Sequence, residues 1–178
     1  MLQYWKQFSI NSDPGPNSFW RIKFIKELAT YSDTSITLQH VKSNMFLGTN
    51  YGYSCNNHYY YRYHESPSTK HTEVSCSNDA MNYYWVKDWK FNHGKVKNHQ
   101  DFLKSNDVIN LSIKRLHDNN GNKTSNGQVE FLRSHYIQFT IGEDALQEVC
   151  CHNERLGGND EWCIELIKQY NWTLDQVC

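Results

Sequence analysis

Short runs of alternating apolar and polar residues follow one another along this chain, and the spacing typical of a helix is nearly absent. Alternation with a period of two is the pattern of a strand with one buried face. Between the runs lie clusters such as "SDPGPNS" and "HDNNGNKTSNG", which favour turns. Many short strands separated by polar turns predict an all-β sandwich or barrel. The predicted strands are residues 19–25, 35–41, 45–49, 83–89, 108–113, 129–134, 136–141 and 162–167.

Part of this pattern occurs twice. Residues 72–89 read "TEVSCSNDAMNYYWVKDW", and residues 147–167 read "QEVCCHNERLGGNDEWCIELI". Glu73 and Glu148 are 75 positions apart and Trp85 and Trp162 are 77 apart, so the two copies keep almost one register. A third Trp-bearing run places Trp20 another 65 positions before Trp85. A repeat of this length indicates an internally symmetric fold.

A leucine-bearing pair of runs precedes each Glu-Val sequence. Leu38 and Leu47 are 9 positions apart, whereas Leu111 and Leu132 are 21 apart, so the later copy carries about 12 extra residues, interpreted as a polar hairpin. Two complete groups and a third Trp run predict a threefold all-β arrangement. Alternation and residue type place the repeated apolar residues in the core. These are Val74, Val149, Trp20, Trp85 and Trp162.

The order of these runs resembles the MIR motif, which protein O-mannosyltransferases, inositol trisphosphate receptors and ryanodine receptors share. The matching residues are "LQHV" (38–41), "LRSH" (132–135), the Glu-Val pairs (73–74 and 148–149) and "NDEW" (159–162), within residues 17 to 167. The resemblance implies a β-trefoil. We expect one domain over residues 1–178, with remnants of a first copy in 1–24, a second copy in 25–89, a third in 90–167 and a tail in 168–178.

The first copy is expected to be incomplete, because residues 1–16 contain neither a Leu-x-His-Val nor a Glu-Val sequence. Those residues could supply one strand but not the full set that the other copies bring. An open side of a barrel exposes strand edges and apolar surface. Self-association into a homodimer through that side is therefore predicted, with closure by residues 1–16 and the tail as the alternative.

Charge and composition narrow the class of partner. The 178-residue chain has a net charge of −1, and its 18 basic residues are interspersed with 19 acidic ones. Nucleic-acid binding needs concentrated Lys and Arg, so no nucleic-acid partner is expected. No apolar run approaches the roughly 18 to 20 residues of a membrane span, so no membrane insertion is expected. No signal peptide is visible in "MLQYWKQFSI", and the location predicted is cytoplasmic, with the endoplasmic reticulum lumen or secretion as alternatives.

The sequence contains residues of the types found in metal and catalytic sites, but none of these groups has the required pattern. The loop "CNNHYYYRYHESPSTKHTEVSC" holds one Cys-x2-His pair, whereas a structural zinc site usually has two such pairs. Adjacent Cys151, His152 and Asn153 cannot converge as nucleophile, base and orienting group. We therefore predict no cofactor, no metal site and no enzymatic activity. The loop residues expected to retain no metal are Cys55, His58, His64, His71 and Cys76.

Two candidate ligand-binding patches remain. One is an aromatic and cationic cluster of a type favoured at protein and sugar contacts, although its tyrosines could simply cover the barrel end. It comprises Tyr59, Tyr60, Tyr61, Arg62, Tyr63 and His64. The other is Arg133, Ser134 and His135 at a strand end, with Lys114 and Arg115 nearby, conceivable as a pocket for an anionic ligand by likeness to the inositol trisphosphate receptor trefoil.

The sequence thus predicts a non-catalytic binding module of MIR type that recognises a protein or glycan ligand through its loops. The alternatives are an accessory or regulatory domain of an O-mannosyltransferase-like glycosyltransferase and an anionic-ligand-binding domain. The chain could also be a fragment of a longer protein.

Overall fold

The computed structural model describes residues 3–6, 19–24, 34–55, 58–60, 62–78, 84–93, 102–118, 120–141 and 144–165. These residues form strands and one 3-10 turn, η3 (Gly158–Asp160). The strands are β1 (Gln3–Lys6), β2 (Phe19–Phe24), β3 (Ile36–His40), β4 (Phe46–Asn50), β5 (Tyr53–Cys55), β6 (His58–Tyr60), β7 (Thr72–Glu73), β8 (Ser75–Ser77), β9 (Trp85–Val86), β10 (Trp89–His93), β11 (Val108–His117), β12 (Lys123–Ile141), β13 (Asp144–His152) and β14 (Trp162–Cys163). Within these ranges, none of the elements is a helix long and apolar enough to cross a membrane.

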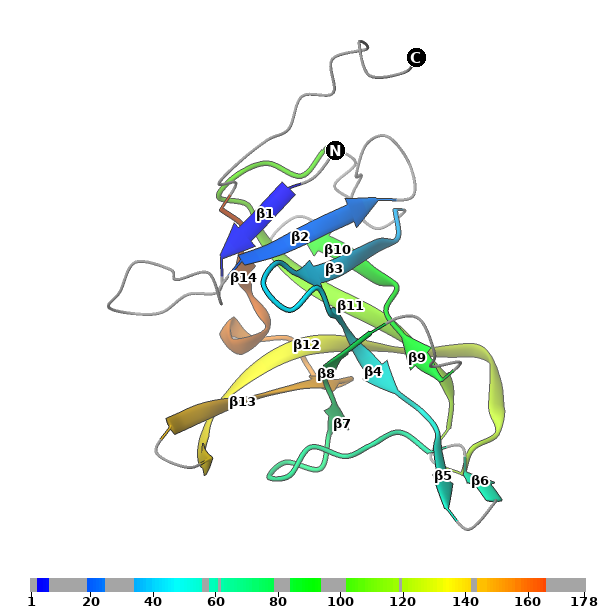
Figure 1. Cartoon of the computed structure of the whole chain (residues 1–178). Helices are drawn as coiled ribbons and strands as arrows, with labels where there is room; N and C mark the ends of the chain where they lie inside the picture. The colour runs from blue at the N-terminus through cyan, green and yellow to red at the C-terminus, as the bar shows by residue number, and fades with distance from the viewer. Residues whose placement is uncertain are drawn as a thin grey trace.

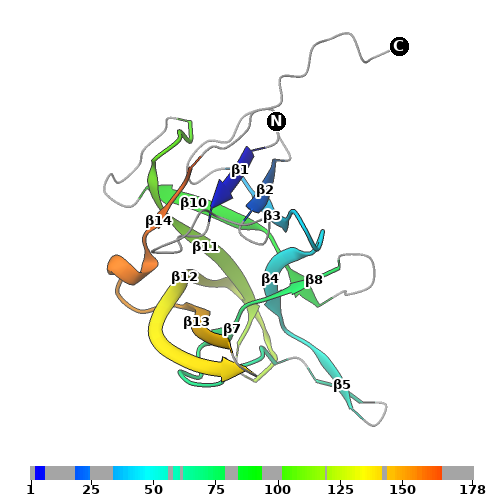
Figure 2. The same ribbon diagram turned by 60° about the vertical axis from the view of Figure 1, so that its left-hand side comes forward.

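Antiparallel pairing joins most strands into one curved sheet. Its main path runs β1-β2-β3-β10-β11-β12-β13-β7, with β4 against β3, β8 and β9, and β14 against β11. Figure 1 shows β2, β3, β10 and β11 crossing the upper part of the molecule, and the long β12 and β13 curving beneath them. The turned view shows β12 bending strongly along its length (Figure 2). The separate β5-β6 ribbon projects at the lower end.

The strand register identifies equivalent positions in successive copies. Trp20 on β2 lies opposite His40, and Trp89 on β10 lies opposite Ile113. Both partners are the second residue after the repeated leucine of their strand, Leu38 or Leu111 by sequence. Trp20 and Trp89 therefore hold the same place between a Trp strand and the leucine strand beside it.

The same register relates Trp89 to Trp162. Each of these tryptophans also pairs with the leucine strand of its own copy, Trp89 opposite Ile36 and Trp162 opposite Ile109. Each partner stands two residues before the repeated leucine. A hydrogen bond repeats too, because both indole Nε1–H groups donate over 3.0 Å to the carbonyl of a leucine, Leu47 or Leu132. Trp20, Trp89 and Trp162 are thus the threefold set.

The prediction that Trp85 belongs to this set is wrong. Trp85 lies on the two-residue strand β9 opposite Asn50, and its buried indole nitrogen has no hydrogen-bond partner among the residues that the structure describes. It packs against Gly48, where an added Cβ would approach the Trp85 ring to 2.9 Å. Two tryptophans stand four positions apart in "WVKDW", and spacing along the chain could not tell which one enters the core.

The hairpins of the two complete copies also match. Leu47 on β4 lies opposite Cys76 on β8, and Leu132 on β12 lies opposite Cys151 on β13. The extra residues of the later copy form the predicted polar hairpin, in which β11 and β12 pair as far as His117 opposite Lys123. Two predicted strands, 129–134 and 136–141, are a single strand β12 whose register shifts after Ser134.

The buried core follows the repeated positions. Trp89, Ile22, Ile36, Leu38, Ile109 and Leu111 are almost completely buried and form one cluster with Phe91, Ile113 and Leu132. The predicted core residues Trp20, Val74, Val149 and Trp162 pack against this cluster and are partly buried. The core therefore sits between the Trp strands and the leucine strands, and each copy contributes the same layers.

The first copy contributes less. On β1, Trp5 lies opposite Trp20. In the second copy, Ile36 lies opposite Trp89 in the equivalent position. Only 12 residues separate β1 from β2, whereas 48 separate His40 from Trp89. Within the described ranges β1 pairs with β2 alone and β14 with β11 alone. An apolar hollow of about 180 Å³ opens between paired repeat residues of the later copies, and among the described side chains Trp20 is the first copy's contribution to it.

Candidate functional site

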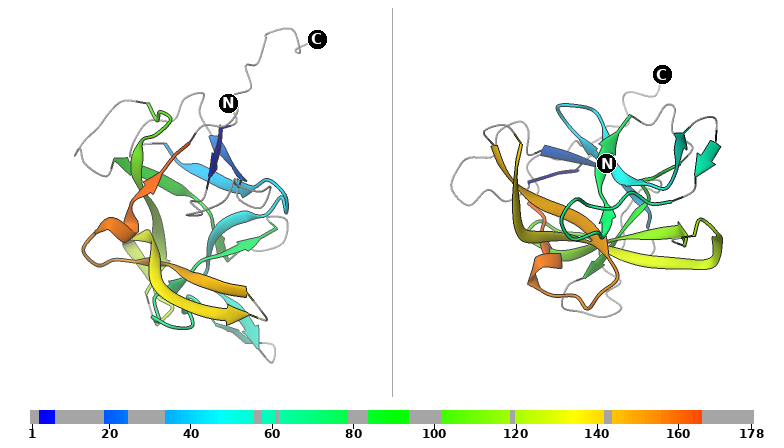
Figure 3. Two further views of the ribbon diagram at one scale, coloured as in Figure 1. Left: turned by 90° about the vertical axis from the view of Figure 1, so that its left-hand side faces the viewer. Right: turned by 90° about the horizontal axis from the view of Figure 1, so that it is seen from below.

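A polar pocket of about 480 Å³ is lined by three segments of the chain. Figure 1 draws these segments in its lower half, and the right-hand view of Figure 3 shows them from below. The pocket walls come from the loop between β6 and β7, the hairpin joining β11 to β12, and the end of β13. The lining residues are Arg62, Tyr63, His64, Glu65, Lys70, His71, Thr72, Arg115, Asp118, Asn120, Gln128, Glu130, Cys151, His152 and Asn153.

Opposite charges balance in this pocket. Three lining residues carry a permanent positive charge and three carry a carboxylate, so the formal charge is zero when the histidines are neutral. The cations are Arg62, Lys70 and Arg115, and the acids are Glu65, Asp118 and Glu130. The pocket therefore offers hydrogen-bond donors and acceptors without a net field.

Arg115 anchors one wall. Its guanidinium lies 4.4 Å above the centre of the Tyr63 ring and 3.3 Å from a Glu130 carboxylate oxygen. The Tyr63 hydroxyl accepts a 2.9 Å hydrogen bond from the Leu116 amide, and burial raises the pKa of Tyr63. The predicted contact residue Tyr63 is therefore a buried part of the wall, with only 4% of its surface exposed.

Glu130 is a buried acid in the pocket floor. Its Oε1 accepts hydrogen bonds from Arg115 and Gln128, at 3.3 and 3.4 Å. Among the described residues its buried Oε2 has no hydrogen-bond partner that meets ordinary geometry, although the nearby Thr72 hydroxyl lowers the acid's pKa. Burial outweighs that contribution and raises the pKa of Glu130. Glu130 Oε2 is an acceptor still available to a ligand hydroxyl.

The tip of the β11-β12 hairpin is held by its own side chain. Asp118 accepts hydrogen bonds from the backbone amides of Asn120 and Asn122, at 2.9 and 2.8 Å. Chiefly the bond from the Asn122 amide lowers the pKa of Asp118. This turn is typical of Asp followed by Asn and Gly, and it places the rim of the pocket.

Arg133 belongs to a different network. Its Nε and one terminal nitrogen hold Asp160 in a bidentate pair at 2.8 and 3.1 Å, and it also donates to Glu154 and to the Arg155 carbonyl. Asp160 is fully buried and takes a further 2.7 Å contact from His152 Nε2. These bonds fasten the η3 turn to β12 and β13, so an anionic ligand at Arg133 would have to displace them.

The Asp160 network fixes protonation states. Burial opposes ionisation of Asp160, but bonds from Arg133, the Gly157 amide and His152 outweigh it and lower the pKa of Asp160. Burial lowers the pKa of His152 against the opposing effect of Asp160. Because the Glu154 amide donates to His152 Nδ1, the ring is neutral with its proton on Nε2.

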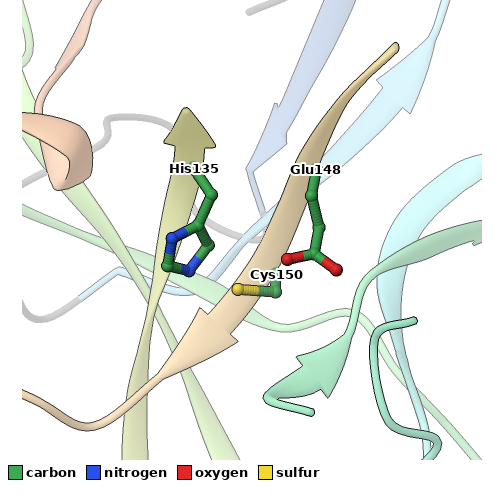
Figure 4. Close-up of side chains that lie close together, drawn as sticks. All are labelled: His135, Glu148 and Cys150. Carbon is green, nitrogen blue, oxygen red and sulfur yellow. The ribbon is translucent and has the colours of Figure 1, made fainter. Parts of the chain in front are cut away.

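A second cluster lies between β12 and β13 and is drawn in Figure 4. One donor atom from each of His135, Glu148 and Cys150 lies within 4.8 Å of the other two. Glu148 and Cys150 are buried, and the buried His135 Nε2 has no hydrogen-bond partner in the part of the chain that the structure describes. Burial raises the pKa of the Cys150 thiol to about 11. The His71 ring stacks on His135, 5.6 Å between centroids, and connects this cluster to the polar pocket.

The structure unites only part of the two predicted patches. Arg62, Tyr63 and His64 line the pocket together with Arg115, which the sequence analysis had assigned to the other patch. Tyr60 is 47% exposed, while Tyr61 and the side chain of Tyr59 lie outside the described residues. Ser134 is half-buried in β12, and Arg133 and His135 are placed as above.

Several pocket residues were not foreseen, among them Lys70, Asp118, Gln128 and Glu130. The polar hairpin was the available signal, because a long hairpin beside a polar loop forms one end of a small barrel. The Cys-His loop set is not gathered within the described residues: His64 faces Glu73 at 3.4 Å and His71 faces Glu154 at 3.7 Å. Cys55 and His58 side chains lie outside them, and the absence of a metal there stays a prediction.

Register, hairpins and core together define an all-β protein of the β-trefoil class, with an incomplete first copy. No protein-family model and no curated protein matches the sequence. Among solved structures, the fold is similar to the crystal structure of the SDF2-like protein from Arabidopsis thaliana, with a TM-score of 0.59 and 18% identity. The match covers 89% of this chain and 78% of that one. At this identity the likeness shows the fold.

Proposed function

We propose that this chain is a non-catalytic binding module of MIR type that takes a neutral glycan in the polar pocket. The repeated sequence order and the trefoil likeness to the SDF2-like protein support the module class. Small trefoils present loops around a rigid frame, and binding residues concentrate on such loops. The single observation that carries the glycan assignment is the charge-balanced, donor- and acceptor-rich lining of the 480 Å³ pocket.

Charge decides between a neutral and an anionic ligand. Arg62 is paired with Glu65, and Arg115 is paired with Glu130. A phosphate would have to compete with both carboxylates and would meet the field of Asp118 as well. A polyhydroxylated ligand meets no such penalty, because each hydroxyl both donates and accepts. The pocket therefore suits a neutral sugar better than the anionic ligand that was the sequence-based alternative.

The volume and accessibility of the pocket agree with such a ligand. Small-molecule pockets are typically about 300 to 1,000 Å³. Lys70, Asn120 and Gln128 are exposed at the rim and carry N–H donors, whereas Glu130 Oε2 is a buried acceptor. A sugar hydroxyl could thus donate a hydrogen bond to Glu130 at the bottom of the pocket, while other hydroxyls accept hydrogen bonds from residues at the rim.

A protein ligand is the second candidate, and one observation favours it. On the surface of β12, Val129 is 50% exposed, Tyr136 is 85% exposed and Ile137 is 41% exposed. Exposed large apolar and aromatic residues are enriched where proteins meet. The module could then accompany an enzyme as an accessory domain, with β12 as the contact.

A glycan array that carries neutral mannose, glucose and N-acetylglucosamine sugars beside phosphorylated and sialylated ones tests the proposal. Binding to neutral sugars is expected. Lys70→Ala should weaken it about 10-fold or more and Gln128→Ala about 3- to 10-fold, since a hydrogen bond to a charged group is worth about 1.5–3 kcal/mol and a neutral one about half that. Lys42→Ala, an exposed site that does not line the pocket, is the matched control. Binding to anionic sugars alone would contradict the proposal.

A further inference from the structure

The cluster of His135, Glu148 and Cys150 is not explained by the fold or by the pocket. Glu148 and Cys150 are two residues apart on β13, so both side chains leave the same face of the strand. His135 stands on the neighbouring strand β12, next to Ser134, which pairs with Val149. Three strand positions therefore bring a nitrogen, an oxygen and a sulfur close together, and Figure 4 shows the Cys150 side chain between those of His135 and Glu148.

We propose that His135, Glu148 and Cys150 bind one zinc ion. Their donor atoms lie within 4.8 Å of one another. Zinc bonds are about 2.0–2.3 Å long, so ligand atoms on one ion lie roughly 3–4 Å apart, and small side-chain rotations bring the three atoms into that range. Three protein ligands leave the fourth tetrahedral position to water.

The donor set fits zinc in kind as well as in distance. Imidazole nitrogen, carboxylate oxygen and thiolate sulfur are its three usual ligands, and magnesium or calcium would not choose the sulfur. A zinc ion held by one carboxylate and one thiolate is electrically neutral, which suits a buried location.

An independent observation also points to a ligand. His135 Nε2 is buried and has no hydrogen-bond partner within the described residues. A buried polar nitrogen left in that state carries a free-energy cost, because it has lost its hydrogen bond to water and gained none in the protein. Coordination of a cation removes this cost, because the nitrogen lone pair is then used.

Glu148 also accepts hydrogen bonds from the turn of residues 66–70, and these bonds leave one lone pair of its carboxylate for the ion. Its Oε1 accepts from the amide of Ser68 at 2.9 Å, whereas Oε2 accepts from the Thr69 hydroxyl at 2.9 Å. A carboxylate oxygen has two lone pairs, so Oε2 retains one for a metal. Zinc would thereby fasten the turn of residues 66–70 to β12 and β13. Since His71 follows this turn and stacks on His135, the ion would stiffen one wall of the polar pocket.

Cobalt(II) is the probe for the test, since it takes zinc sites and reports thiolate ligation through a charge-transfer absorption band. Titration of reduced, metal-free protein should give this band with an end point of one cobalt per chain, and added zinc should abolish it. Cys150→Ser should weaken cobalt binding more than about 100-fold, because even indirect partners of metal ligands are worth about 10- to 100-fold. His135→Gln, at a half-buried position, should weaken it similarly.

Cys76→Ser is the matched control, because Cys76 is exposed and lies opposite Leu47 as Cys151 lies opposite Leu132. Circular dichroism without metal checks that each variant is folded. The inference is overturned if the wild type shows no band at stoichiometric cobalt, if the band survives in both Cys150→Ser and His135→Gln, or if Cys76→Ser removes it. Sugar binding is measured separately, so failure here leaves the glycan proposal standing.

Discussion

Asp160 is expected to be a large single contributor to stability, and Asp160→Ala tests this. The substitution removes the carboxylate that pairs with Arg133 and accepts from His152 and the Gly157 amide. Breaking a buried ion pair by removing one partner costs about 3–5 kcal/mol, because it leaves the other charge uncompensated. Arg133 would keep Glu154 and the Arg155 carbonyl, which places the expected loss near the lower limit, at about 3 kcal/mol.

Urea unfolding followed by tryptophan fluorescence measures the loss, since Trp162 lies two residues from Asp160. Asp160→Asn keeps the shape of the side chain and one acceptor oxygen, and it should lose less than the alanine variant. Glu154→Ala is the control, because Glu154 is exposed and exposed ion pairs contribute about 0–1 kcal/mol. A loss below about 1 kcal/mol in Asp160→Ala would refute the idea that this network holds η3 to the barrel.

Three further predictions concern the core, acid stability and assembly. In urea unfolding, Trp89→Phe should lower the free energy of unfolding by about 1–3 kcal/mol more than Trp85→Phe does, because only the Trp89 substitution removes a hydrogen-bond donor from the Leu47 carbonyl. Equal losses would contradict the assignment of Trp89, rather than Trp85, to the threefold set. Stability should fall as the pH drops below about 6.5, the unfolded pKa of His, because the folded pKa of His152 is lowered and the unfolded chain takes up protons first. Asp160, whose folded pKa is also lowered, adds a further loss as the pH falls below about 3.9 and through its folded value; urea midpoints that stay flat from pH 7 to pH 3 would disprove both. Light scattering at micromolar concentration should show a mass of twice 21.1 kDa if the first copy's open side is covered by a second chain, and a constant monomer mass would argue against it.

The repeat was readable from the sequence because each copy must bury the same layers. Leu38 and Leu111 occupy matching register positions, as their spacing implied. Trp85 was assigned to the threefold set in error, because insertions change the spacing between repeats. Only the strand pairing shows that Trp89, and not Trp85, faces the core. No strand was predicted at the Glu-Val pairs, yet Glu73 lies on β7 and both Glu148 and Val149 lie on β13.

The candidate sites were harder to predict, since they depend on contacts between distant segments. Arg115 was grouped with Arg133, yet the β11-β12 hairpin carries it to Tyr63, 52 residues earlier in the chain. Arg133 is of a residue type that is common at ligand contacts, but its donors bond to the Asp160 carboxylate, 27 residues later in the sequence. The His135 cluster needs a histidine on one strand and two alternate residues on the next, which a pattern of zinc-ligand pairs along the chain does not reveal.

The proposed sugar pocket lies between the loop before β7 and the β11-β12 hairpin of the β-trefoil frame. Backbone amide chemical-shift mapping by NMR, with titration of neutral disaccharides of mannose and of glucose, measures whether a neutral sugar binds there. Saturable shifts are expected for Lys70, Thr72, Gln128 and Glu130, and unchanged shifts on the exposed stretch of β12 around Tyr136. Saturable shifts confined to that stretch of β12, or none for either sugar at millimolar concentration, would contradict the proposed sugar pocket.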